Sequence, residues 1–151
     1  MDRIDFDILD KLQKNARMSN KELAAAVGLA PSSCLERVRR LEREGVLRGS
    51  HAEVDPQALG IGLQAMIQVR LEHHSRREVE GFRNHVLGLE AVLAFYHLTG
   101  AFDFMVLVAV QDADALRDLA LDAFTTRKEV AQIQTSLVFE SRRDPVLPVY
   151  A

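Results

Sequence analysis

A helix stop and a helix start stand two residues apart near the N-terminus of this 151-residue chain. Gly28 ends one helix, because glycine enters the left-handed cap conformation without a Cβ penalty. Pro31 starts the next, since its missing N–H would have no partner at the first helical position. Two helices joined by a turn of about four residues that contains glycine form a helix-turn-helix. This spacing therefore predicts a helix-turn-helix over the first third of the chain.

Capping signals set the other helix boundaries. Ser19 and Glu22 form a capping box, in which each side chain accepts the backbone N–H of the other residue, so a helix begins there. The third helix runs from Pro31 to about Glu44, and Gly45 closes it. An earlier helix carries an apolar stripe at helical spacing, formed by Ile4, Ile8, Leu9 and Leu12.

The third helix is expected to bury one face and to expose a basic one. At 100° per residue, Leu35, Val38 and Leu41 form the inward stripe. The same spacing puts Ser33, Glu36, Arg40 and Arg43 opposite that stripe, with Ser32, Arg37 and Arg39 at the sides of the exposed face. Arginine neutralises phosphate or bonds a guanine edge in two places, and serine bonds phosphate or base, so the other face suits DNA recognition. The candidate DNA-binding residues are Lys21, Ser32, Ser33, Glu36, Arg37, Arg39, Arg40 and Arg43. The alternative is a solvated helix with charge pairs four residues apart.

The charge distribution differs between the two parts of the chain. Residues 1–50 hold 10 Lys or Arg and 8 Asp or Glu, a net charge of +2, whereas residues 51–151 hold 9 and 14, a net charge of −5. A basic segment joined to an acidic one indicates two functions on one chain, and ordinary solvated faces are the alternative.

The remaining two thirds alternate between strands and helices. Residues 61–72 alternate strictly between apolar and polar, which predicts a strand with one wet face. Helices are expected over 75–86 and 113–124, and further strands over 91–99, 102–110 and 130–140. This order predicts the ferredoxin-like βαββαβ plan, a four-stranded antiparallel sheet with both helices on one face. We expect a second copy of the chain to bury the uncovered face.

The expected fold class is α+β: a helix-turn-helix (winged-helix-like) domain joined to a ferredoxin-like domain. We place the first domain at 1–50, a linker at 51–61, the ferredoxin-like domain at 62–141 and a C-terminal tail at 142–151. The segment 46–54 is short and partly β-like, and Asp55-Pro56 ends it.

Composition excludes several classes of protein. The longest apolar run is far shorter than the ~18–20 residues that span a bilayer, so we expect no membrane association. The acidic N-terminus lacks the plan of a secretory signal. Cys34, the single cysteine, is interpreted as a small buried hydrophobe rather than a redox sensor. His73 and His74 are adjacent at a strand end and point apart, so we expect no metal site. The chain is expected to be cytoplasmic, with no catalytic centre and no cofactor.

Short motifs recur along the whole chain: Asp5-Phe6-Asp7-Ile8-Leu9, Arg17-Met18-Ser19, Glu22-Leu23-Ala24, Val27-Gly28-Leu29, Pro31-Ser32, Arg37–Glu42, Gly45-Val46, Val54-Asp55-Pro56, Leu59-Gly60 and Thr99–Phe104. Their order and spacing resemble the Lrp/AsnC family of bacterial and archaeal transcription regulators. Two positions depart from the family pattern. Ala30 stands where the family commonly has a capping serine, and Glu36 stands where many members are basic. The Glu36 carboxylate accepts from cytosine N4 but repels phosphate, so it bears on the operator sequence.

The resemblance implies a homodimer formed through the C-terminal sheets, a further ring of dimers that is often an octamer, and an amino-acid effector. The loop Thr99–Asp103 stands where the family has a Thr-Gly-x-Tyr/Phe-Asp motif. Asp103 could accept from an α-ammonium group, and backbone N–H groups near Gly100 could take the α-carboxylate. The effector-binding candidates are His97, Thr99, Gly100, Ala101, Phe102, Asp103, Thr135 and Ser136. The alternatives are a plain hairpin turn at Gly100 and a packed or interfacial His97.

The expected function is therefore a sequence-specific regulator that binds double-stranded DNA and responds to an amino acid. Two alternatives stay open. Some proteins that resemble this family are sirohaem decarboxylases, for which His97, His73 and Arg70 would be the candidate residues. The chain has no Ser-His-Asp set, no phosphate-cradling glycine loop and no close carboxylate pair. The other alternative is an effector-binding module without DNA binding, which Ala30 and Glu36 support.

Overall fold

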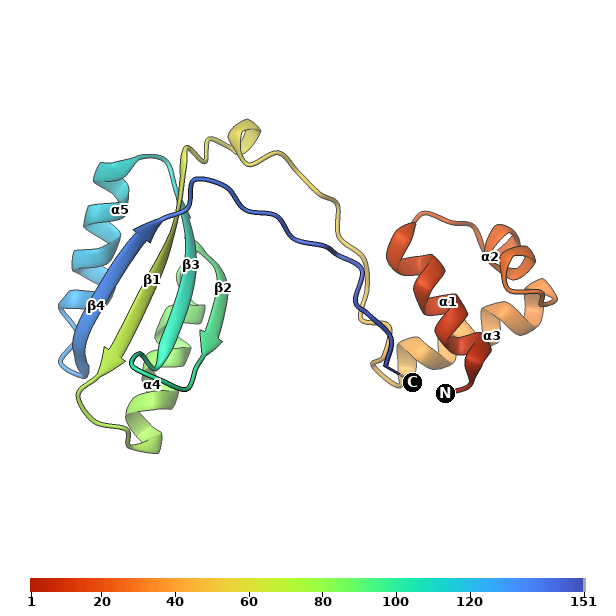
Figure 1. Ribbon diagram of the computed structural model, residues 1–151, viewed down its shortest axis with the longest axis horizontal. Coiled ribbons are helices and arrows are strands. Elements are labelled where there is room, and N and C mark those ends of the chain that lie inside the picture. The colour runs from red at the N-terminus through yellow and green to blue at the C-terminus, as the bar shows by residue number, and fades with distance from the viewer. Residues whose placement is uncertain (151) are drawn as a thin grey trace. The chain divides into compact units, whose positions relative to one another are not determined.

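The computed structural model describes residues 1–150, and the chain divides into two compact units (Figure 1). The first unit comprises residues 1–53 together with the C-terminal segment from Arg142 onward. The second unit comprises residues 54–141. The tail thus packs with the N-terminal helices, where the Leu147 N–H donates to the Gln13 side-chain oxygen at 2.7 Å.

The first unit contains helices α1 (Arg3–Lys14), α2 (Asn20–Ala26) and α3 (Pro31–Arg43). The predicted capping box is confirmed, since Ser19 Oγ accepts from the Glu22 N–H at 3.3 Å and Glu22 Oε2 accepts from the Ser19 N–H at 2.8 Å. Gly28 and Gly45 have φ values of 70° and 69°, the left-handed conformation in which glycine is favoured. Ala30 is the N-cap of α3 and makes no side-chain cap bond.

The core of the first unit corrects the predicted orientation of α3. The fully buried residue near its start is Cys34, whereas Leu35 is 37% exposed, so the prediction that Leu35 faces inward is wrong. The inward stripe is Cys34, Val38 and Leu41, which packs against buried residues of α1 and α2. The interpretation of Cys34 as a small buried hydrophobe is confirmed by its complete burial in this core.

Residues 46–56 form no strand, which differs from the partly β-like character predicted there. A strand requires a neighbouring strand to satisfy its backbone N–H and C=O groups. No strand among residues 1–150 pairs with this segment. It is an extended connection that leads to a short 3₁₀ turn over Gln57–Leu59.

The second unit confirms the ferredoxin-like order. Its elements are β1 (Leu63–Leu71), α4 (Arg76–Leu87), β2 (Val92–His97), β3 (Phe104–Val110), α5 (Ala113–Leu119), a π-helical continuation (Ala120–Thr125) and β4 (Val130–Leu137). The four strands are antiparallel in the order β2-β3-β1-β4 (Figure 1). Ser75 caps α4 and Asp112 caps α5, where the Asp112 carboxylate accepts from the Ala115 N–H at 2.8 Å.

Both helices of the second unit pack on one face of the sheet. The alternation predicted for the first strand is confirmed, because Ala65, Ile67, Val69 and Leu71 are all buried against the two helices. Three stacked or edge-on phenylalanine contacts surround Phe104 and Phe82 in this core. The opposite face carries no helix of this chain. It exposes a mixed set of side chains that includes Gln64, Met66, Gln68, Tyr96, Met105, Leu107, Gln134 and Ser136.

Candidate DNA-binding helix and effector loop

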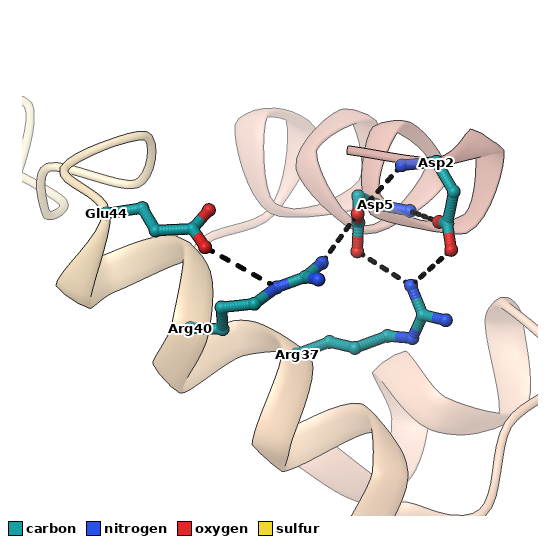
Figure 2. A network of polar contacts seen from close by, with 5 residues as sticks. All are labelled: Asp2, Asp5, Arg37, Arg40 and Glu44. Atoms are coloured by element: carbon teal, nitrogen blue, oxygen red, sulfur yellow. Dashed lines mark hydrogen bonds and ion pairs between the residues drawn. The ribbon is translucent and has the colours of Figure 1, made fainter.

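A buried carboxylate joins the first helix to the candidate recognition helix (Figure 2). Asp5 on α1 is fully buried and receives a guanidinium on each oxygen. Arg37 Nη1 donates to Asp5 Oδ1 at 2.8 Å, and Arg40 Nη2 donates to Asp5 Oδ2 at 2.6 Å. Arg37 also donates to Asp2 Oδ2 at 2.7 Å. Four ionised side chains therefore fix the orientation of α3 against α1.

The same carboxylates cap α1. The Asp2 N–H donates to Asp5 Oδ2 at 2.9 Å, and the Asp5 N–H donates to Asp2 Oδ1 at 3.0 Å. This reciprocal pair is a capping box built from two aspartates. Each carboxylate thus satisfies a backbone donor of its own helix and a guanidinium of another helix.

Hydrogen bonds decide the charge state of this network. Burial alone would raise the pKa of Asp5, but the Asp2 N–H and the guanidinium groups of Arg37 and Arg40 outweigh it, so the pKa lies below its ordinary value. The hydrogen bond from Arg37 likewise lowers the pKa of Asp2, and the bond to Asp2 raises the pKa of Arg37. The cluster is therefore ionised at neutral pH.

The arginines of α3 fall into two groups. Arg37 and Arg40 point at α1, and their side chains are 28% and 39% exposed. Arg39 and Arg43 are exposed and form no ion pair with any residue of the described chain. They lie on one exposed ridge at helical spacing, formed by Ser32, Glu36, Arg39 and Arg43. The sequence analysis instead placed Arg40 with Arg43 at the centre of the exposed face, because the partner Asp5 is remote in the chain.

The start of α2 lies against the start of α3. The Asn20 side-chain amide donates to the Pro31 carbonyl at 2.8 Å, which places the two helix starts side by side. Lys21, the next residue, is exposed, as are Ser32 and Ser33 in the first turn of α3. One apolar residue, Leu35, lies exposed beside the ridge, although the sequence analysis placed it in the core.

The division of the arginines predicts that the two pairs contribute unequally to stability. Replacing both Arg37 and Arg40 by alanine leaves the buried Asp5 carboxylate without a cation, which should lower the free energy of unfolding of the first unit by about 3–5 kcal/mol. Replacing both Arg39 and Arg43 by alanine should change it by less than about 0.5 kcal/mol. Amide hydrogen exchange of α1 and α3 measures both values. Equal losses in the two double variants would contradict the assignment.

The lowered pKa of Asp5 predicts a pH dependence. Because the folded-state pKa lies below the ordinary value of 3.8, the folded state binds fewer protons than the unfolded state in that region. The stabilisation is therefore present above about pH 4 and is lost as the pH falls through the folded-state value. Asp5→Asn should unfold more easily at pH 7 and show a flatter profile below pH 4. Asp7→Asn, at an exposed position of the same helix, should keep the original profile.

A second carboxylate organises the loop between β2 and β3. Asp103 Oδ2 accepts from the Leu71 N–H at 2.8 Å, and the Asp103 N–H donates to the Val69 carbonyl at 2.9 Å. The Leu98 N–H closes the loop by donating to the Asp103 carbonyl at 2.7 Å. The outer oxygen, Oδ1, lies 2.7 Å from His74 Nε2. Asp103 thus anchors the loop to the end of β1, and His74 is a neighbour that the sequence analysis did not include.

The remaining effector candidates occupy different places. Thr99, Gly100 and Ala101 form the exposed tip of the loop, where Gly100 has a φ of 125°. Phe102 is half-buried. The ring of His97 packs on Phe104 with centroids 4.8 Å apart, which places it on the helix-covered side of the sheet.

Thr135 and Ser136 lie farther along the sheet. They pair with Ile67 and Met66, four and five residues before Leu71, which is roughly 13–17 Å at the rise of a strand. They also point to opposite faces, since Ile67 is buried against the helices and Met66 is not. Within one chain, the structure therefore gathers residues 99–103 and His74 but leaves Thr135 and Ser136 apart from them.

Other features of the described chain carry no comparable site. A surface cleft of about 390 Å³ between α4 and the start of β4 is lined by three acidic and three basic side chains, among which Glu129 pairs with Arg127. Within residues 1–150, no group of three or more His, Cys, Asp or Glu is arranged to hold a metal ion. No helix in that range is long and apolar enough to cross a membrane.

Comparison with known families gives a consistent match for both units. Residues 1–48 match the family described as winged helix-turn-helix DNA-binding. Residues 64–146 match the family described as Lrp/AsnC ligand binding domain. The two matches together cover α3 and the loop with Asp103.

Individual proteins similar to this chain over most of its length are also transcriptional regulators. The HTH-type transcriptional regulator AldR of Mycolicibacterium smegmatis is 43% identical over 143 residues, covering 95% of this chain and 84% of that protein. The leucine-responsive regulatory protein of Escherichia coli is 37% identical over 140 residues, covering 93% of this chain and 85% of that protein. A transcriptional regulator of Neisseria meningitidis, solved as a complex with L-Met, superposes with a TM-score of 0.86 at 33% identity, covering 95% of this chain and 92% of that one.

Proposed function

The chain belongs to the Lrp/AsnC family of DNA-binding transcriptional regulators, and we propose how its residues perform that function. In this proposal α3 enters the major groove of operator DNA. An amino acid bound at the Thr99–Asp103 loop changes the affinity for DNA or the assembly of the protein. The observation that carries the proposal is the exposed ridge of α3, where Arg39 and Arg43 have no ion pair in the described chain while their neighbours are held by Asp5.

The contacts divide by chemistry. Arg39, Arg43 and Lys21 supply positive charge for phosphates or a guanine edge. Ser32 and Ser33 lie in the first turn of α3, where side-chain hydroxyls and the helix N-terminus suit a phosphate or a base edge. Arg37 and Arg40 act by holding α3 in position. Glu36 is on the same ridge, and a carboxylate there favours a cytosine and disfavours a phosphate at that place.

DNA binding is tested by fluorescence anisotropy on the DNA upstream of the protein's own gene, against scrambled DNA, over a salt series. Arg39→Ala and Arg43→Ala should each weaken binding and reduce the slope of log affinity against log salt by about one. Arg83→Ala, on the exposed surface of α4 in the second unit, is the matched control and should leave both quantities unchanged. Parent-like affinity and slope in both ridge variants would contradict the assignment of α3.

The effector is proposed to be an amino acid with an apolar side chain. A relative named leucine-responsive and a similar structure that contains L-Met favour this class. In this chain the half-buried Phe102 and the 37% exposed Leu98 offer apolar surface beside Asp103. The Asp103 carboxylate would accept the α-ammonium group, and loop N–H groups near Gly100 would donate to the α-carboxylate.

The effector site is tested by thermal shift with each of the twenty amino acids. Leucine, methionine or a similar residue should raise the melting temperature of the parent protein by mass action. Asp103→Asn retains an oxygen for the Leu71 N–H but loses the negative charge, so it should abolish the shift. Asp122→Asn, whose side chain is exposed on the π-helical segment, should retain it. An unchanged shift in Asp103→Asn would place the effector elsewhere.

Assembly is proposed to use the uncovered sheet face. Met66 lies opposite Leu107 and Tyr96 opposite Met105, which gives this face an apolar centre bordered by glutamines. A second copy of the same face would bury it, with the two-fold symmetry that paired DNA half-sites require. We further propose that such dimers assemble into an octamer, act on DNA in the cytoplasm and catalyse no reaction.

A further inference from the structure

We propose that His74 competes with the effector: its imidazole occupies the one oxygen of Asp103 that an α-ammonium group would use, and the effector must displace it. The inference rests on the proposed effector site and adds a residue that controls its affinity. It starts from the 2.7 Å contact between His74 Nε2 and Asp103 Oδ1.

The two side-chain oxygens of Asp103 have different hydrogen-bond partners. Oδ2 accepts from the Leu71 N–H, and the Asp103 backbone bonds to both Val69 and Leu98. These three bonds hold Asp103 in place without any help from His74. Oδ1 is therefore the oxygen that can exchange partners while the loop keeps its conformation. Because the Asp103 side chain is 15% exposed, a departing partner needs to be replaced by another donor.

The His74 side chain can move away from Asp103 at little cost in free energy. Its side chain is 62% exposed, so moving the imidazole away uncovers little apolar surface. The backbone that follows is fixed independently, because Ser75 Oγ accepts from the Glu78 N–H at 3.2 Å and donates to Glu78 Oε2 at 2.6 Å at the start of α4. Displacement is thus a rotamer change of one exposed side chain, which takes picoseconds to nanoseconds.

Competition has a defined effect on affinity. When part of the protein has Oδ1 occupied by His74, the apparent Kd for the effector is raised by the inverse of the free fraction. An exposed pair of this kind is weak, so the factor is about two- to fivefold. The factor acts on association, since the effector meets a blocked carboxylate. Dissociation proceeds from a complex in which His74 has already left.

Asp103 also distinguishes between ligands. A ligand that places a charged ammonium on Oδ1 forms an ion pair together with a hydrogen bond, whereas a hydroxyl donates a hydrogen bond without the positive charge. The factor set by His74 is the same for every ligand that must displace the imidazole, so the preference for an ammonium group comes from Asp103 and not from His74. The matching 2-hydroxy acid, which carries a hydroxyl in place of the ammonium, therefore tests the ammonium contact on which the competition depends.

The test compares His74→Ala with His73→Ala in the full-length protein. His73 is the adjacent exposed imidazole and has no hydrogen bond or ion pair among the described residues, so it controls for the loss of a histidine from this segment. L-leucine and L-methionine are the probes, calorimetry gives Kd, and nuclear magnetic resonance exchange gives the rates. His74→Ala should bind about two- to fivefold more tightly through faster association, with unchanged dissociation.

Each other outcome is decisive. Parent-like or weaker binding in His74→Ala overturns the competition, as does a gain that comes from slower dissociation. An equal gain in His73→Ala attributes the effect to the charge of the segment and also overturns it. If neither probe binds the parent protein or any variant, the effector site at this loop is wrong, and the proposal about His74 falls with it. The 2-hydroxy analogue of leucine should bind more weakly than leucine to the parent and to His74→Ala alike, and equal affinities of the two ligands would overturn the ammonium contact on which the competition depends.

Discussion

The geometry of the first unit depends on one buried carboxylate. Asp5 lies at the interface of α1 and α3 with no exposure to solvent, where an ionised group is tolerated if it is fully paired. Two guanidinium groups and one backbone N–H supply that pairing. Because a guanidinium is planar and its donors point in fixed directions, the two arginines hold α3 at a set rotation as well as a set distance. The same rotation turns Arg39 and Arg43 of the ridge toward solvent.

The second unit also contains a hydrogen-bonded carboxylate, Asp103, but its side-chain partner is more exposed than those of Asp5. Asp103, like Asp5, accepts a backbone N–H on one oxygen, but its side-chain donor lies on the other oxygen alone, whereas Asp5 takes a guanidinium on each. The partners differ in burial. Arg37 is 28% exposed and is shared with a second carboxylate, whereas His74 is 62% exposed and contacts Asp103 alone. The contacts of Asp5 therefore suit a permanent link between α1 and α3. The second suits a contact that a ligand replaces, which is the basis of the competition proposed for His74.

Much of the fold was predictable from local signals. The Ser19–Glu22 capping box, Gly28, Pro31 and Gly45 each act within a few residues, so they set the helix boundaries without knowledge of the tertiary structure. The alternation of β1 was equally local, since one face of that strand is buried against both helices. The family resemblance rested on the same local motifs and is confirmed by matches to both units.

The errors and omissions involve contacts between distant residues. Both Leu35 and Cys34 were expected to be buried, and the structure buries Cys34 but leaves Leu35 37% exposed. The arginines of α3 were indistinguishable by residue type, and Asp5, more than thirty residues away, separates them. The opposite facing of Thr135 and Ser136 follows from the alternation of a strand, but their distance from the Asp103 loop follows from the register between β1 and β4, which a single sequence does not specify. His74 reaches Asp103 across 29 residues for the same reason.

In the proposed arrangement, Asp5 fixes α3 through Arg40 and leaves Arg39 available to DNA. A double-mutant cycle on the free energy of unfolding tests this arrangement, with Asp5→Asn combined in turn with Arg40→Ala and with Arg39→Ala. The coupling energy should be about 1 kcal/mol or more for Asp5 with Arg40 and within about 0.3–0.5 kcal/mol of zero for Asp5 with Arg39. Equal coupling energies for the two pairs would show that Asp5 does not distinguish Arg40 from Arg39.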